Sequence, residues 1–397
     1  MHARYHHGVT AARRRILITG VSRFWGGHLA QRLESHPDVE EIVAIDTMGP
    51  TVELHRTDVV RADIRHSLIG KLVRSMDIDT VVHTALIVDP QRSGGRSVHE
   101  TNVIGTMNLL AACAGADSPV RKLVVKASTA VYGSEPSDPS FWSERMTRKA
   151  PARDAFTRDL DEVESYVHEF SLRKPEAIVT LMRFANILGP THDTPFTRLF
   201  DLPVVPTVLG FDPRLQFLHE QDAVRVLEHA VLNDRPGTFN VAGDGIALVS
   251  QAISMMGKVN APILPFIGAG PVMFAINRVL PVNFPQHLVR LLQFGRVVDT
   301  TALRERFGIT LSHSTIDTLR EHARERRVRK IVRDQRRYRY EADLEEFLRA
   351  RTTSGNGHGA NKSDQPSVVL PPSSERRTST RRVRTRVASK RSNGVKP

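Results

Sequence analysis

Short apolar runs alternate with amphipathic segments along the chain up to about residue 250. Apolar runs bounded by polar residues or glycine predict buried strands, and apolar positions that recur every three or four residues predict helices. We expect strands at residues 16–18, 42–45, 59–64, 80–84, 122–127, 178–184 and 238–241, and helices at 67–76, 98–114, 153–171 and 221–232. This alternation predicts an α/β fold, a doubly wound parallel sheet of the Rossmann type with helices on both faces.

The first strand, turn and helix are typical of a dinucleotide-binding unit. Gly20 lets the backbone turn tightly after the strand, and Gly26 lets the next helix approach the sheet closely. The N-terminus of this helix offers unpaired N–H groups and a positive dipole end to a pyrophosphate. Asp46 follows the second strand, where its carboxylate is placed to accept hydrogen bonds from the adenosine ribose. The unit predicts dinucleotide binding, and the alternative is a sheet that keeps the turn without the ligand.

Changes in composition divide the chain into segments. Proline and glycine become frequent between residues 188 and 216 and between 261 and 285, which indicates the loops of a smaller lobe. We expect a flexible N-terminus (1–12), a main domain (13–310), a basic helical extension (311–351) and a disordered basic tail (352–397). Within the main domain we expect a Rossmann core at about 13–186 and 217–247 and a C-terminal substrate lobe at about 187–216 and 248–310.

The net charge of +13 is carried by the C-terminal part of the chain. Residues 320–340 contain ten Lys and Arg, three acidic residues and few apolar ones, which predicts a solvated helix. Residues 352–397 contain ten Lys and Arg, two acidic residues and almost no large apolar side chains, which predicts disorder. The tail is either a solvated segment or a weak contact to an anionic surface. Without aromatic interleaving or a nucleic-acid-binding fold, no specific nucleic-acid partner is expected.

Cysteine occurs once, at Cys113, so no internal disulfide can form and a cytoplasmic location is expected. The N-terminus shows no signal-peptide pattern. The most apolar stretch, residues 261–276, is interrupted by prolines and is too short to span a bilayer. We therefore expect no transmembrane segment, and we interpret this stretch as core of the substrate lobe.

Six phrases of the sequence resemble the extended short-chain dehydrogenase/reductase family and occur in the order of that family. They are VVHTA (81–85), NVIGT (102–106), STAVYG (128–133), RFANILGP (183–190), FLHEQD (217–222) and GTFNV (237–241). Within that family the chain resembles the NAD-dependent epimerases/dehydratases of nucleotide sugars, and most of all actinobacterial members labelled UDP-glucose 4-epimerase-like. The resemblance covers roughly residues 15–310. It implies NAD as cofactor, a nucleotide sugar as substrate, and a homodimer formed through the helices at 98–114 and 153–171.

The resemblance also implies roles for particular residues. The cofactor-binding positions are Gly20, Arg23, Phe24, Trp25, Gly26, Asp46, Asp63, Ile64, Thr84, Ala85, Asn102 and Ala185, and Asn186 meets the nucleotide sugar. Taken alone, Asp63 is also typical of a turn cap. We expect His83, His219 and Asp222 to hold loops. Their spacing is not that of a metal site, so no metal is predicted.

The glycine turn departs from the pattern of the family at Arg23, where the middle glycine usually stands. An arginine there resembles NADP-binding relatives, in which a guanidinium pairs with the 2′-phosphate. Asp46 argues for NAD, because its carboxylate would face that phosphate with like charge. We expect NAD rather than NADP.

The catalytic pair of the family is missing from this sequence. The resemblance implies a tyrosine, a lysine one helical turn later, and a serine or threonine on the fifth strand, which is Ser128 here. The tyrosine and lysine positions are occupied by Phe156 and Leu160, and none of the five tyrosines has a lysine four residues later. The helix instead shows an apolar stripe made of Phe156, Leu160, Val163, Val167 and Phe170. This stripe predicts that the former catalytic positions pack in a core or at a helix–helix interface.

Three explanations of the missing pair stay open: binding without turnover, catalysis with a relocated acid/base, and a different alignment of this helix. Lys126 is a candidate for relocation, because strand alternation puts it on the same face as Ser128. Two roles are considered for Lys126. It supplies positive charge beside the nicotinamide ribose, or it pairs with a carboxylate at the strand edge. Tyr132 is the weaker candidate, since it stands in a phrase where the tyrosine of the family is usually structural.

Two functions are therefore considered. One is an NAD-dependent UDP-sugar 4-epimerase or related enzyme with an atypical active site. The other is a non-catalytic module that senses NAD or a sugar nucleotide and engages an anionic partner through its basic tail.

Overall fold

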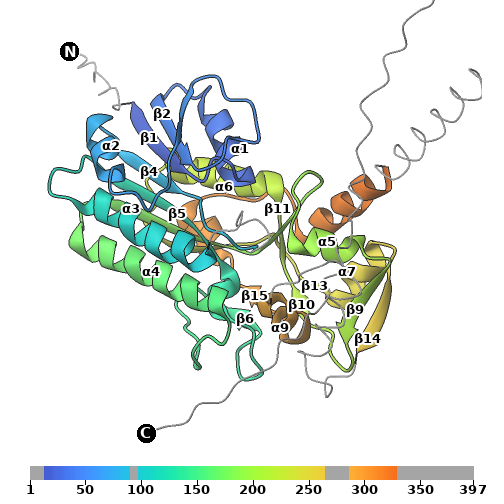
Figure 1. Cartoon of the computed structure of the whole chain (residues 1–397). Helices are drawn as coiled ribbons and strands as arrows, with labels where there is room; N and C mark the ends of the chain where they lie inside the picture. Colours follow the sequence, from blue (N-terminus) through green and yellow to red (C-terminus); the bar gives the residue numbers. More distant parts are fainter. Residues whose placement is uncertain (1–12, 90–96, 264–285, 329–397) are drawn as a thin grey trace, which may run out of the picture. The chain divides into compact units, whose positions relative to one another are not determined.

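The structure, a computed structural model, describes residues 13–89, 97–263 and 286–328 (Figure 1). Its centre is a seven-stranded sheet with the order β12-β7-β5-β4-β1-β2-β3, in which all neighbouring strands are parallel. The strands are β1 (Arg14–Thr19), β2 (Val39–Asp46), β3 (Thr57–Arg61), β4 (Thr80–His83), β5 (Lys122–Ser128), β7 (Ile178–Phe184) and β12 (Gly237–Val241). The predicted doubly wound Rossmann-type sheet is confirmed, although β3 ends at Arg61 instead of residue 64.

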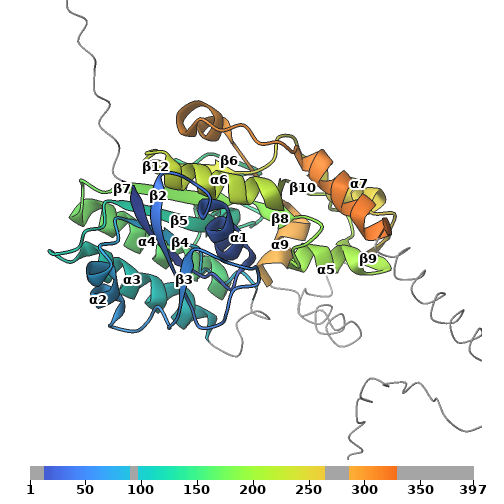
Figure 2. The same cartoon turned by 90° about the horizontal axis from the view of Figure 1, so that it is seen from above.

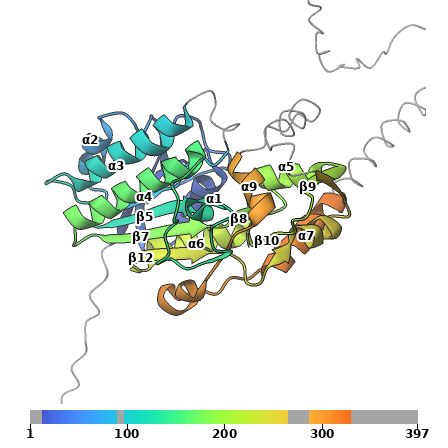
Figure 3. The same ribbon diagram turned by 90° about the horizontal axis from the view of Figure 1, so that it is seen from below.

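Helices cover both faces of this sheet. They are α1 (Phe24–Leu33), α2 (Ile69–Ser75), α3 (Gly105–Ala114), α4 (Ala155–Arg173) and α6 (Glu220–Leu232). Alternate residues of a strand point to opposite faces, so Ile16 and Ile18 pack in the core with α1 and α6, whereas Leu17 packs in the core with α3 and α4. Figures 2 and 3 show α1 and α6 on one side of the sheet and α2, α3 and α4 on the other.

The helix predicted at residues 98–114 is not regular. It contains a π-helical turn, η2 (Glu100–Ile104), before α3 begins at Gly105. A π-turn inserts one extra residue into the helical ladder and shifts the side chains that follow it. Here it places Asn102 in the interior, where that side chain bonds the chain that leaves β4.

Helix α4 carries the apolar stripe expected from the sequence. Phe156, Leu160, Val163, Val167 and Phe170 are all buried. Asp154 caps the helix, since its carboxylate accepts a hydrogen bond from Thr157 N at 2.8 Å. The cap fixes where the helix begins and therefore which side chains face the core.

The segments inserted after β7 and β12 build a smaller group of elements around a core of their own. Its elements are α5 (Pro195–Asp201), β9 (Val204–Val208), β10 (Arg214–Leu215), β13 (Ala247–Leu248), α7 (Val249–Met255), β14 (Val259–Ile263) and α9 (Gln286–Phe294). This core contains Phe196, Phe200, Leu215, Phe217, Leu291 and Leu319. Two further strand pairs, β8 (Asn186–Leu188) with β11 (Phe217–His219) and β6 (Phe141–Trp142) with β15 (Val297–Val298), accompany it.

The start of the basic extension differs from the solvated helix predicted for it. Residues 315–328 are helical, but one face of this helix is buried and Leu319 belongs to the core of the smaller group. The buried positions are Thr315, Thr318, Leu319, His322 and Ala323. These positions recur with the period of a helix. Because most of them are not large apolar residues and charged residues lie between them, the sequence shows no clear amphipathic pattern.

Several predictions fall on other parts of the chain. The flexible N-terminus (1–12), the rest of the basic extension (329–351) and the basic tail (352–397) lie outside the described residues, as do residues 264–285. Among the helices that are described, none combines the length and the apolar character needed to cross a membrane.

The close packing of α1 on the sheet leads to a first prediction. A Cβ at Gly26 would lie 2.4 Å from Gly20 O and 2.8 Å from Thr84 Oγ1, so Gly26→Ala forces the helix away from the sheet. We expect the free energy of unfolding to fall by about 2 kcal/mol or more, as measured by denaturant titration. Gly49→Ala is the matched control, because a Cβ there meets nothing within 4 Å, and its stability should stay within about 0.5 kcal/mol. Equal stability of the two variants would contradict this account.

Candidate functional site

The turn after β1 brings the backbone of three segments into close contact. Gly20 has φ +83°, and a Cβ on it would lie 2.7 Å from the backbone of Ala85. Helix α1 begins at Phe24 without a side-chain cap from Arg23 and without an acidic residue in its first turn. Because α1 follows β1 directly, its positive end lies at the carboxyl edge of the sheet, where it favours an anionic group.

Asp46 lies at the end of β2 beside this turn, as expected. One carboxylate oxygen accepts hydrogen bonds from Ser22 N (3.1 Å) and Ser22 Oγ (2.6 Å), and the other accepts one from Thr47 N (2.7 Å). These bonds hold the carboxylate next to the glycine turn. Its role toward a ribose stays a prediction.

Asp63 shows the turn-capping geometry that the sequence left open. Its carboxylate accepts a hydrogen bond from Arg65 N at 2.9 Å and pairs with the Arg65 guanidinium. The neighbouring Ile64 is buried against Gly105, whose added Cβ would lie 2.6 Å from Ile64 Cδ1. The adenine contact expected of these two residues stays a prediction.

The chain that leaves β4 is held by buried hydrogen bonds. Thr84 Oγ1 donates to Thr19 O (2.8 Å), and Asn102 Nδ2 donates to Ile87 O (3.0 Å) while its Oδ1 accepts from Ile87 N (2.7 Å). His83 lies between Thr19 Oγ1 (2.7 Å) and Thr106 Oγ1 (2.9 Å), and burial lowers its pKa to about 4. These bonds brace the edge of the sheet, and the interior position of neutral His83 suits a structural role.

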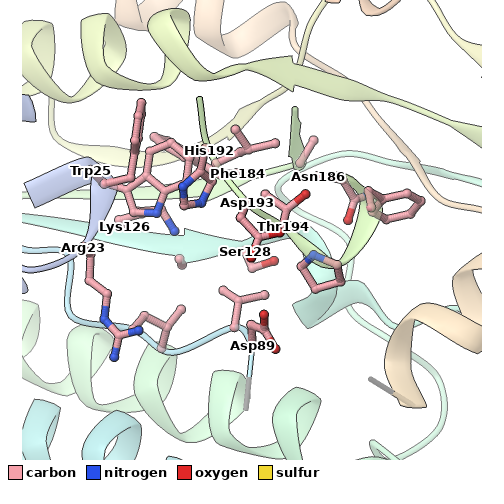
Figure 4. Close-up of a pocket in the computed structure, with 18 of the residues that line it drawn as sticks. Arg23, Trp25, Asp89, Lys126, Ser128, Phe184, Asn186, His192, Asp193 and Thr194 are labelled. Atoms are coloured by element: carbon pink, nitrogen blue, oxygen red, sulfur yellow. The ribbon is translucent and has the colours of Figure 1, made fainter. Parts of the chain in front are cut away.

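Lys126 and Ser128 both line a pocket at the carboxyl edge of β5, as strand alternation predicted (Figure 4). Lys126 is only 3% exposed, and its Nζ lies 5.4 Å from the centre of the Trp25 ring and 5.5 Å from that of Phe184. Burial first and the nearby charge of Arg23 second lower the pKa of Lys126 to about 8. Within the described part of the chain no carboxylate pairs with Lys126, so the strand-edge ion pair considered from the sequence is not observed.

The wall opposite β5 contains side chains that the sequence did not single out. His192 packs on Trp25 with ring centres 4.5 Å apart, and both line the pocket together with Asp89 and the expected Ala185 and Asn186. The buried Glu220 positions this wall, because its carboxylate accepts a hydrogen bond from His192 N at 2.9 Å. The sequence signal for Glu220 was its place within the family phrase FLHEQD (217–222).

The positions expected for the catalytic pair lie in a core instead of the pocket. Leu160 is fully buried and Phe156 is 8% exposed, and the Phe156 ring packs on His287 at 4.7 Å. Tyr132 is also buried, and its hydroxyl donates to Asn240 Oδ1 (2.8 Å) and accepts from Arg183 Nη1 (2.7 Å). None of these three residues lines the pocket that contains Ser128. Tyr132 is therefore a structural residue in this fold.

Comparisons with known proteins agree with this architecture. The model of the NAD dependent epimerase/dehydratase family matches residues 16–242. The uncharacterized protein Rv0501 of Mycobacterium tuberculosis is 38% identical over 326 residues, which cover 80% of this chain and 85% of that protein.

Solved structures share the fold at low sequence identity. The UDP-glucose 4-epimerase of Thermotoga maritima, crystallised with UDP-glucose, aligns with a TM-score of 0.60 and 18% identity over 79% of this chain and 98% of that chain. The UDP-glucuronic acid 4-epimerase of Bacillus cereus, in complex with NAD, aligns with a TM-score of 0.58 and 21% identity over 78% of this chain and 98% of that chain. The glycine turn, the parallel sheet and the family match together show that this chain belongs to the NAD-dependent epimerase/dehydratase family.

Proposed function

We propose that the chain binds NAD and a nucleotide sugar in the pocket at the carboxyl edge of β5, and that it has lost the usual proton-transfer pair of its family. The similar solved structures contain UDP-glucose or NAD. When bound, NAD supplies a hydride acceptor, and the residues of this chain bind and orient the two ligands. The actinobacterial epimerase-like subgroup, a homodimer and a cytoplasmic location are parts of the same proposal.

The residues around the turn fit a dinucleotide. The N-terminus of α1 at Phe24 and Trp25, which has no side-chain cap, suits the pyrophosphate. The backbone of Thr84 and Ala85 lies close to Gly20 in the turn before this helix. Asp46 supports NAD over NADP, since a 2′-phosphate would meet its carboxylate beside Ser22. Arg23, which also lines the pocket, offers positive charge to the phosphates.

The burial of Phe156 and Leu160 carries the second half of the proposal. The chemistry of the family needs a hydroxyl that gives and takes a proton, and a positive charge that lowers its pKa. At these positions the helix α4 offers two apolar side chains inside a core. No small movement converts this surface into an acid/base, so catalysis of the usual kind is lost.

A second candidate function rests on Lys126. Its amine lies in the pocket near Ser128, without a carboxylate partner among the described residues, and burial lowers its pKa to about 8. A lysine in such a state can hold the nicotinamide ribose or transfer a proton. An enzyme with this relocated group would interconvert UDP-sugars slowly through Lys126 and Ser128.

Hydride transfer separates the two candidates. We expect the purified chain to bind NAD more tightly than NADP in calorimetric titrations. With UDP-glucose or UDP-galactose added, we expect no absorbance of reduced nicotinamide and epimer formation at least about a thousandfold slower than in a relative that retains the tyrosine and lysine. The Thermotoga maritima epimerase serves as the active control. Failure to bind either dinucleotide would overturn the first half of the proposal, and rapid epimer formation would overturn the second.

Two lysines of β5 provide a matched test of the pocket. Lys122 donates to Val231 O, Asn233 O and Asp234 Oδ1 at 2.7–2.9 Å, so Lys122→Met should cost about 2 kcal/mol of stability and leave NAD affinity unchanged. The lowered pKa shows that the charged Lys126 is buried at a cost on the order of 3 kcal/mol. Lys126→Met should therefore preserve or raise stability while it weakens NAD binding at least tenfold. Denaturant titration and calorimetry measure both quantities. Loss of stability in Lys126→Met with unchanged affinity would show that Lys126 is structural.

The pH dependence follows from the same two groups. Burial lowers the pKa of Lys122 and of Lys126 from 10.5 to about 8. Between these values the unfolded chain binds protons that the folded chain does not, so the free energy of unfolding should rise with pH from about 8 to 10.5. NAD affinity should begin to fall as the pH rises past about 8, because Lys126 of the folded protein loses its charge there. In Lys126→Met this fall should disappear, and an identical fall in the variant would contradict the assignment.

A further inference from the structure

Two histidines and a glutamate from three separate segments meet beside β11. His219 ends β11, His313 lies in the loop after η5 (Leu303–Phe307), and Glu321 belongs to the helix at 315–328. Glu321 Oε1 lies 3.5 Å from His219 Nε2, and Oε2 lies 3.3 Å from His313 Nε2. One ligand atom of each residue lies within 4.8 Å of the other two.

The buried nitrogen of His219 lacks a proper partner. The imidazole is 0% exposed, and its Nε2 has no hydrogen-bond partner among the described residues. The Glu321 oxygen at 3.5 Å is too distant for a good hydrogen bond. A buried polar nitrogen without a partner is costly, so its presence calls for a ligand.

His313 is oriented as a histidine that binds a metal. Its Nδ1 lies 2.9 Å from Oδ2 of the fully buried Asp222, which also accepts hydrogen bonds from the backbone of Ser312 and His313. A carboxylate at Nδ1 holds the proton on that nitrogen and leaves the lone pair of Nε2 free. That free nitrogen faces Glu321.

We propose that His219 Nε2, His313 Nε2 and the Glu321 carboxylate bind one divalent zinc ion. Two imidazoles and one carboxylate form a donor set typical of zinc, whereas magnesium and calcium prefer oxygen ligands alone. The side chains of His313 and Glu321 are 22% and 36% exposed, so water completes the coordination from the solvent side. Binding at Nε2 requires the His219 proton on Nδ1, so the long 3.3 Å hydrogen bond that Gln221 N donates to Nδ1 is given up when the ion binds.

This ion would act as a structural link. It joins the helix at 315–328 to the end of β11, and none of its ligands lines the pocket around Ser128. His322 of the same helix lies 3.0 Å from Gly189 O, and Glu220, next to His219, holds His192 in the pocket wall. The zinc ion therefore fixes the segment that closes one side of the pocket.

Zinc binding to the full chain tests the proposal independently of NAD and of activity. The protein is prepared without a polyhistidine tag, and His2, His6 and His7 are changed to alanine in every sample, because they could bind zinc by themselves. After treatment with a chelator we expect one zinc ion per chain in calorimetry and in metal analysis after dialysis. The melting temperature should rise with zinc and fall again with chelator, since the ion binds only the folded chain.

Two variants and two matched controls locate the ion. Glu321→Gln and His313→Ala should each weaken zinc binding at least tenfold and abolish the shift in melting temperature. Glu325→Gln, one turn further along the same helix, and His66→Ala, an exposed histidine, should bind zinc like the parent. Cobalt(II) in the parent should give the intense visible bands of a four-coordinate site.

Other results would overturn the inference. These are a chain that retains no zinc, zinc binding that is unchanged in both Glu321→Gln and His313→Ala, and a weak six-coordinate cobalt spectrum. Circular dichroism of each variant confirms its fold, and the cobalt spectrum of the parent decides the question even if a variant fails to fold.

Discussion

The contact between the turn at Gly20, helix α1 at Gly26 and the chain after β4 determines where the pocket lies. These backbones are so close that neither glycine has room for a Cβ. The helix is therefore fixed against the sheet, and its positive end, with Arg23 and Trp25, is brought to the edge where β5 ends. The close packing of α1 on the sheet therefore places the positive charge of Arg23 and the aromatic ring of Trp25 at the pocket.

Helix α4 presents an apolar face at the positions where the family resemblance implies the tyrosine and the lysine, and this face lies in a core outside the pocket. Phe156 and Leu160 complete the apolar face of α4, so the helix uses these positions for packing. The remaining polar side chains of the pocket come from β5 and from loops. Among these, Lys126 costs stability where it stands, because a buried amine with a lowered pKa has no carboxylate beside it in the described structure. Retaining such a residue against stability is typical of a binding or reaction site.

Local patterns in the sequence predicted the sheet, most of its helices and the shared face of Lys126 and Ser128, because these depend on the period of strands and helices. The strand–turn–helix–strand pattern at the start of the chain predicted the position of Asp46, and the family phrase at 102–106 predicted that of Asn102. The π-turn before α3 and the buried face of the helix at 315–328 were missed, since neither changes the local apolar period clearly. The cluster of His219, His313 and Glu321 was beyond the reach of spacing rules, because tertiary packing joins residues about a hundred positions apart.

The helix at residues 315–328 shows that the folded unit around the pocket extends beyond the segment that matches the family. The family match stops at residue 242, yet Thr315 donates to Gly243 O at 3.0 Å and accepts from Phe217 N at 3.3 Å. Leu319 joins the core of the smaller group, and His322 contacts the loop that carries His192 toward Trp25. Removing this helix would expose that core and release the wall of the pocket. The start of the basic extension therefore supports the wall of the pocket from behind, although its charge is typical of a solvated segment.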